Sequence, residues 1–95
     1  MDRLLKIDPK DNVATSLADL AEGAVVEVPD GAARLSVKLR SPIPFGHKFA
    51  LTDIAAGEAV LKYGVVVARA TRAIAAGEHV HLHNVESNRG RGDRD

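Results

Sequence analysis

The sequence predicts a single all-β domain of short strands, and three observations carry that prediction. Valine-rich and alternating apolar runs are separated by Gly, Pro and Asp, which is typical of strands and tight turns. The segment IAAGE occurs at 54–58 and again at 74–78, and a looser copy, LAEGA, occupies 20–24. At 95 residues, the chain has room for one domain and one small core.

The repeated segments predict turns that feed strands. Each copy contains a glycine that accepts positive φ at little steric cost: Gly23, Gly57 and Gly77. Two or three copies in so short a chain favour a domain with an internal pseudo-two-fold repeat over a solenoid.

The strands follow from local patterns. Leu35, Val37 and Leu39 alternate with polar residues, as expected of a half-buried strand. Residues 13–21 have a spacing that fits either a strand or one to two helical turns, so one short helix near 15–21 stays open. The other predicted strands cover 4–7, 25–28, 47–51, 60–62, 65–71 and 79–85.

Composition excludes several classes of protein. Acidic and basic residues number 13 each, which argues against nucleic acid as a partner. No apolar run is long enough for a membrane span, and no hydrophobic core of a signal peptide follows the first residues. Without cysteine there is no disulfide and no thiolate metal site. We expect a cytoplasmic domain over 1–87 and a disordered charged tail over 88–95.

The histidines form the closest grouping of chemically reactive side chains in the sequence. His79, His81 and His83 alternate in the run EHVHLHNVES. On a strand they would share one face, with Val80, Leu82 and Asn84 on the other. Imidazole is a common metal ligand and titrates near neutrality. Three collinear rings rarely reach one metal, so we expect two of them and a residue from elsewhere to converge, on Fe(II), Mn(II) or Zn(II). The simpler interpretation is an exposed polar strand face.

Four further residues are candidates for contact with a substrate. His47 and Lys48 are adjacent, which suits a base or ligand beside a cation that holds a carboxylate. Tyr63, the single tyrosine, could offer a hydroxyl, although a packed ring is the more ordinary role. Asn84 follows His83 and could contact substrate, bond the end of the ribbon or hold a turn.

Two long phrases resemble a known family. IPFGHKFALTDIAAGEAVLKYG and ATRAIAAGEHVHLHNVES, with an opening IDPKDNVA, look like the SAF-type module of the altronate/galactarate dehydratases. The sulfolactate sulfo-lyase small subunit is similar. The resemblance covers roughly residues 4–87 and implies a β-clip fold, a folded-over ribbon of short strands.

The resemblance also implies a function. Members are lyases that remove water, or sulfite, from a hydroxy acid and act with a larger catalytic domain or subunit. It implies a divalent metal, Fe(II) or Mn(II), held mainly by that partner. His47, Lys48 and His81 would act in catalysis, Lys48, Tyr63 and Asn84 would bind substrate, and a subset of the four histidines would bind metal. Whether the chain also forms a homo-oligomer is left undecided.

Two other interpretations stay open beside the lyase subunit. The chain could be a non-catalytic carbohydrate-binding module, or a structural subunit whose histidines lie in an interface. A stand-alone enzyme fits least well, since 95 residues leave little room to enclose a polyhydroxy acid.

Overall fold

A computed structural model describes residues 4–5, 10–30 and 33–87 of the chain. In these ranges the domain is all-β, as predicted. The strands are β1 (Leu4–Leu5), β2 (Val13–Ser16), β3 (Val25–Asp30), β4 (Ala33–Lys38), β5 (Lys48–Ala50), β6 (Ala59–Lys62), β7 (Val65–Ala70), β8 (His79–Val80) and β9 (Val85–Ser87). The predicted tail at 88–95 lies outside the described residues.

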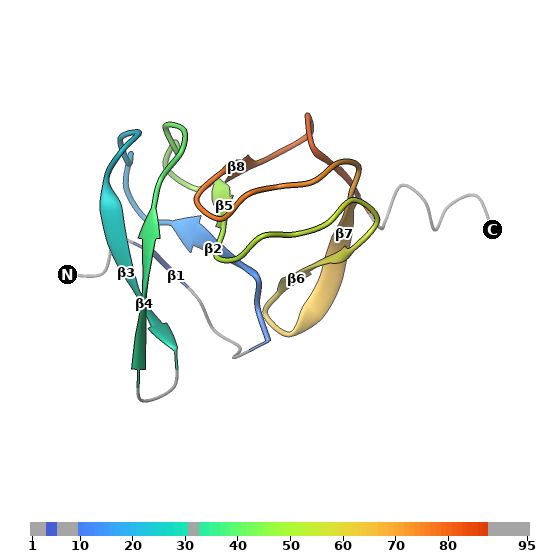
Figure 1. The fold of residues 1–95 in the computed structure, drawn as a ribbon, viewed down its shortest axis with the longest axis horizontal. Helices are drawn as coiled ribbons and strands as arrows, with labels where there is room; N and C mark the ends of the chain where they lie inside the picture. Colours follow the sequence, from blue (N-terminus) through green and yellow to red (C-terminus); the bar gives the residue numbers. More distant parts are fainter. Residues whose placement is uncertain (1–3, 6–9, 31–32, 88–95) are drawn as a thin grey trace.

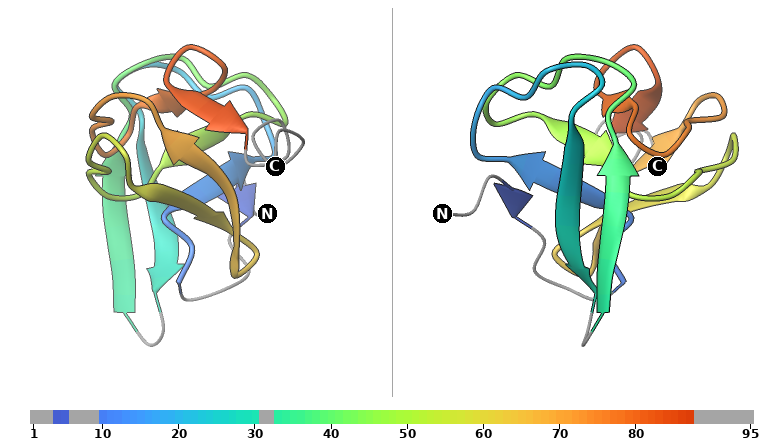
Figure 2. Two further views of the ribbon diagram at one scale, coloured as in Figure 1. Left: turned by 90° about the vertical axis from the view of Figure 1, so that its right-hand side faces the viewer. Right: turned by 60° about the vertical axis from the view of Figure 1, so that its left-hand side comes forward.

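A small antiparallel sheet lies at the centre, in the order β1-β2-β5-β8. The hairpin β3–β4 flanks it on one side, and the β6-β7-β9 sheet flanks it on the other (Figure 1). The turned views in Figure 2 show the two hairpins as separate ribbons folded back on the central strands. This is the folded-over ribbon, or β-clip, that the resemblance implies.

Both faces of the central sheet pack against apolar side chains. Neighbouring residues of a strand point to opposite faces, and neighbouring residues of β2 and β5 join different apolar clusters. Ala14 and Phe49 pack into one apolar cluster with the β3–β4 hairpin. Val13 and Ala50 pack into a second cluster with β6 and β7. The small core predicted from composition is therefore divided in two by this sheet.

The internal repeat is confirmed, and it is more complete than the sequence suggested. The bridge between Leu20 and Ile43 in the first half matches the bridge between Ile54 and Ile74 in the second. Each of these four residues is followed, three positions later, by a glycine with φ between 82° and 87°. The copy at Ile43–Gly46 was missed because Pro44 and Phe45 replace the two alanines.

Hydrogen bonds from side chains to the backbone hold the repeated turns in equivalent ways. The Asp19 carboxylate accepts a hydrogen bond from the Phe45 N–H at 2.8 Å, and Asp53 does the same for Ala76 at 2.9 Å. Glu58 and Glu78 accept from the N–H groups of Ala55 and Ala75. In the first half, the place of Glu78 is taken by His47: Ser16 N donates to the His47 carbonyl as Ala50 N donates to that of Glu78.

The helix allowed near 15–21 is absent, since β2 continues to Ser16 and no helix occupies 17–21. Ser16 exchanges backbone hydrogen bonds with the turn at Gly46 and His47, and Leu20 exchanges them with Ile43. The backbone groups that a helix would bond internally are thus used between the two segments. Across the described residues there is also no helix long and apolar enough to cross a membrane.

Strand boundaries agree in most places. The break at Tyr63-Gly64 is confirmed, and both residues have positive φ, as in a type I′ hairpin turn. β3 runs through Pro29 to Asp30 rather than ending at Val28. The long last strand expected over 79–85 is wrong: β8 covers only His79–Val80, and a turn follows it.

Candidate functional site

The four histidines meet at one end of the central sheet, and we call them the histidine cluster (His47, His79, His81 and His83). His47 comes from the turn before β5, and His79 begins β8, its neighbouring strand. His47 Nδ1 and His79 Nε2 lie 2.8 Å apart, in a hydrogen bond whose direction depends on the tautomers. The predicted meeting of ribbon histidines with a residue from elsewhere is therefore observed, with His47 as that residue.

The rings of the histidine cluster are stacked. Ring centroids are 4.6 Å apart for His47 and His81, with planes 11° from parallel. They are 5.0 Å apart for His47 and His79, and 5.4 Å for His79 and His81. His83 is tilted against His79 at 5.7 Å. His47 and His79 are half-buried, and His81 and His83 are exposed.

A turn, rather than a strand face, places His81 and His83. The Asn84 side chain is fully buried; its Oδ1 accepts from the His81 N–H at 3.0 Å, and its Nδ2 donates to the His79 carbonyl at 2.8 Å. This amide closes the loop, so Leu82 points outward with 82% of its surface exposed instead of packing beside Val80. Because Asn84 is buried and bonded at both ends, we assign it to positioning the histidines rather than to the predicted substrate contact.

Two contacts that support the histidine cluster were not predicted. The Ser41 hydroxyl accepts a hydrogen bond from the His79 N–H at 3.0 Å. The Glu78 carboxylate accepts a hydrogen bond from the Ala75 N–H and so holds the turn that leads directly into His79. Glu78 occupies the position in its turn that His47 occupies in the turn at Ile43–Gly46. This equivalence could have pointed to the contact made by Glu78, but only after the turn at Ile43–Gly46 had been recognised as a fourth copy of the repeat.

Lys48 and His47 are adjacent in sequence, but the side chain of Lys48 belongs to a different face of the central sheet from the one that the histidine cluster borders. Lys48 pairs with Val80, whose side chain belongs to the second apolar cluster, whereas Phe49 pairs with His79 and belongs to the first. Residues opposite each other on neighbouring strands share a face. Lys48 therefore lies on one face of the central sheet, and the histidine cluster borders the other.

The described residues do not form a complete metal site. They contain no group of three or more His, Asp or Glu side chains arranged to hold an ion. Stacked rings direct their nitrogen lone pairs along separate, nearly parallel planes, whereas ligands must converge on one point. His47 Nδ1 and His79 Nε2 approach a common point, so the described residues offer at most that pair of ligands.

The electrostatics favour a neutral His79. Burial is the main cause that lowers the pKa of His79 below its ordinary 6.5, and His47, His81, His83 and Lys48 lower it further. A neutral imidazole at neutral pH can accept a proton or donate its own. The exposed His81 and His83 connect the half-buried pair with solvent.

We predict that stability falls as the pH drops through about 6.5, the ordinary pKa of histidine. The unfolded chain protonates His79 more readily than the folded chain, so acid favours unfolding, and the loss levels off below the folded pKa. Urea unfolding between about pH 7.5 and about pH 5.5 measures it. His79→Gln should show a smaller loss over this range; an equal loss would contradict the assignment.

A shallow hollow of about 790 Å³ lies elsewhere, beside the β3–β4 hairpin, and is lined in part by Glu22, Lys38 and Arg40. It contains none of the predicted site residues. The histidine cluster instead sits on an open edge, which fits a surface that another part of a protein completes.

The β-clip with a histidine-lined edge defines a small SAF-type domain. Residues 2–88 match the family described as the altronate/galactarate dehydratase SAF domain, and the chain belongs to that family.

Relatives carry this domain in two settings. The altronate dehydratase of Escherichia coli (strain K12) is 52% identical over 84 residues, which are 88% of this chain but 16% of that protein. The galactarate dehydratase of the same strain is 38% identical over 80% of the chain and 14% of its own length. The (2R)-sulfolactate sulfo-lyase subunit alpha of Chromohalobacter salexigens is 46% identical over 55 residues, 58% of each chain. The chain thus spans about a sixth of the length of the dehydratases and more than half of the sulfo-lyase subunit alpha.

Proposed function

We propose that this chain is the small subunit or domain of a hydroxy-acid lyase, most simply a sugar-acid dehydratase that yields a 2-keto-3-deoxy acid. The observation that carries the proposal is the histidine cluster, which gathers the titratable rings on an open edge within a matched dehydratase domain. A large catalytic partner supplies the rest of the site, since relatives hold this domain within much longer chains.

The proposed chemistry is an elimination. A base removes the proton from the carbon next to the carboxylate, and the hydroxyl on the neighbouring carbon leaves as water after it takes a proton. The electron pair of the broken C–H bond forms the new double bond. The resulting enol becomes the 2-keto acid, so no oxidant or reductant is needed.

His47 and His79 are the pair suited to move that proton. In their 2.8 Å hydrogen bond one ring donates its N–H to the lone pair of the other, so a proton can pass between the two rings. His81, stacked on His47, is exposed and can exchange protons with substrate or solvent. A divalent metal, Fe(II) or Mn(II), would take its remaining ligands from the partner; no step assigned to these residues depends on it.

The test is a chimera. The matching region of the Escherichia coli altronate dehydratase is replaced by this chain, and dehydration of altronate is assayed beside the protein with that region deleted. The chimera should recover activity that the deletion lacks, because the domain supplies half of the site. A well-folded chimera as inactive as the deletion would contradict the proposal.

A further inference from the structure

Two lysines converge on the face of the central sheet that lies away from the histidine cluster. Lys48 lies on β5, and Lys62 is the last residue of β6; both are half-buried. Burial lowers the pKa of Lys48, and the positive charge of Lys62 lowers it further. Among the described residues, no carboxylate forms an ion pair with either lysine. The described part of the fold therefore brings two cations near each other.

A hydroxyl is placed beside them. Thr15 lies directly opposite Lys48 in the β2–β5 pairing, so the two side chains share a face. The Thr15 Oγ1 atom is buried and has no hydrogen-bond partner among the described residues. Buried hydroxyls are nearly always bonded, so an unpartnered one marks a place where a ligand or water completes the structure.

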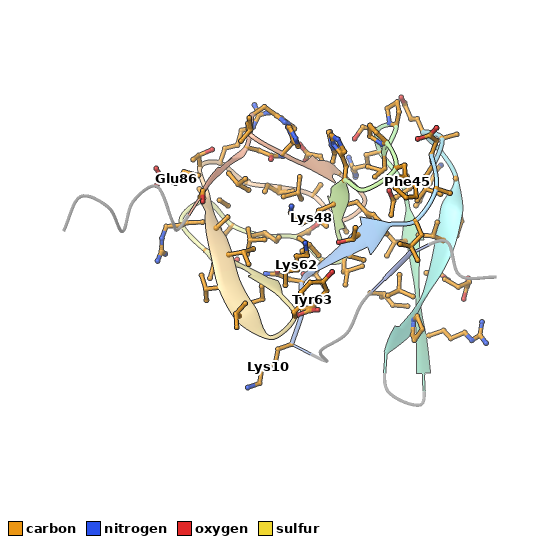
Figure 3. All side chains as sticks on the ribbon, turned by 180° about the vertical axis from the view of Figure 1, so that it is seen from behind. Lys10, Phe45, Lys48, Lys62, Tyr63 and Glu86 are labelled. Carbon is orange, nitrogen blue, oxygen red and sulfur yellow. The ribbon has the colours of Figure 1, made fainter. Side chains whose placement is uncertain are left out.

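The position of Lys62 is fixed by its surroundings. Its Nζ lies 4.8 Å from the centroid of the Tyr63 ring, within range of a cation–π contact. The adjoining turn is held by the buried Asp11 carboxylate, which accepts from the Gly64 N–H at 2.8 Å. Figure 3 shows Lys48, Lys62 and Tyr63 in succession on this side, with Lys10 further along, past the tip of the β6–β7 hairpin.

We propose that Lys48 and Lys62, with the Thr15 hydroxyl, bind the carboxylate of a small organic acid. An anion between two ammonium groups removes their repulsion and gains charge-assisted hydrogen bonds. The sequence predicted Lys48 as a carboxylate ligand and Tyr63 as a substrate contact; the geometry adds Lys62, which lies between them. The site itself is defined by these residues. The inference that its natural ligand is a hydroxy acid rests on the proposed function.

The test is thermal unfolding of the full chain with galactarate or malonate, compared with chloride at equal ionic strength. Ligands that bind the folded state raise the Tm according to concentration over Kd. The dicarboxylates should raise the Tm of the wild type, with a Kd at least about 10-fold weaker in Lys48→Gln and in Lys62→Gln. Lys38→Gln, at an exposed lysine on β4, should bind as the wild type does.

Two outcomes would overturn the site. One is no rise in Tm beyond that in chloride. The other is an equal rise in Lys48→Gln and Lys62→Gln, which would indicate general ionic effects. Both variants should fold without anion, since each removes one of two repelling charges. His47→Ala should keep the dicarboxylate effect, so failure of this site and failure of the proposed function give different results.

Discussion

Among substitutions that add one methyl group, Gly77→Ala is expected to destabilise the domain most. Gly77 has a φ of +87°, which costs an alanine about 1–2 kcal/mol. A Cβ at this position would also overlap the Lys38 carbonyl oxygen and press on the Cα of Leu39 at 3.3 Å. Both are backbone atoms, and the Gly77 carbonyl is itself bonded to the Arg40 N–H at 2.9 Å. A total loss of roughly 3–5 kcal/mol follows, a large share of the stability of a small domain.

Gly57→Ala is the matched control for this prediction. Gly57 occupies the equivalent turn of the repeat with the same φ of +87°, but a Cβ there meets no atom within 4 Å. It should lose only the cost of the backbone conformation, about 1–2 kcal/mol. Urea unfolding of the two variants measures the difference; equal losses would show that the close approach of Gly77 to the end of β4 is not rigid.

Asn84→Ala is expected to have the second largest effect and to disrupt the histidine cluster. The change leaves the His79 carbonyl and the His81 N–H without their partner and opens a small cavity. Buried groups that lose a partner cost about 1–3 kcal/mol each, so we expect a loss of roughly 2–5 kcal/mol. Imidazole NMR should show that the pKa of His79 moves back toward 6.5 as the cluster opens.

The same turn supplies the control for Asn84. Leu82, two residues earlier, is 82% exposed, so Leu82→Ala should leave the stability and the His79 titration nearly unchanged. An Asn84→Ala protein with the wild-type His79 titration would show that the amide does not organise these rings.

Local patterns predicted the elements whose causes are local. The glycine turns follow from backbone preferences that a few residues carry, and Gly64 marks the hairpin in the same way, although Tyr63 has a φ of 57° that a bulky residue rarely adopts. The run 79–85 failed as a strand because the buried amide of Asn84 closes a loop there, a tertiary contact that alternation does not reveal. The sequence could not exclude a helix near 15–21 for the same reason, because the backbone hydrogen bonds between Leu20 and Ile43 join residues far apart in sequence.

The candidate site was predicted in its residue types more than in its arrangement. Clustering of His47 with the ribbon histidines was expected, but stacked rings were not, because ring orientation depends on the turn. The separation of His47 from Lys48 follows from strand alternation once β5 is known. Lys62 gave no signal of its own, since its importance depends on the fold that brings it near Lys48.

The central claim is that the histidine cluster takes part in the reaction of a larger lyase. The most direct measurement is the kcat for altronate of the chimera carrying His47→Ala or His81→Ala, with the folding of each variant checked by urea unfolding. Loss of a positioned acid or base typically lowers the rate by about 10²–10⁴-fold, and we expect a loss in that range with little change in KM. Wild-type kcat in both variants, at unchanged stability, would contradict the account.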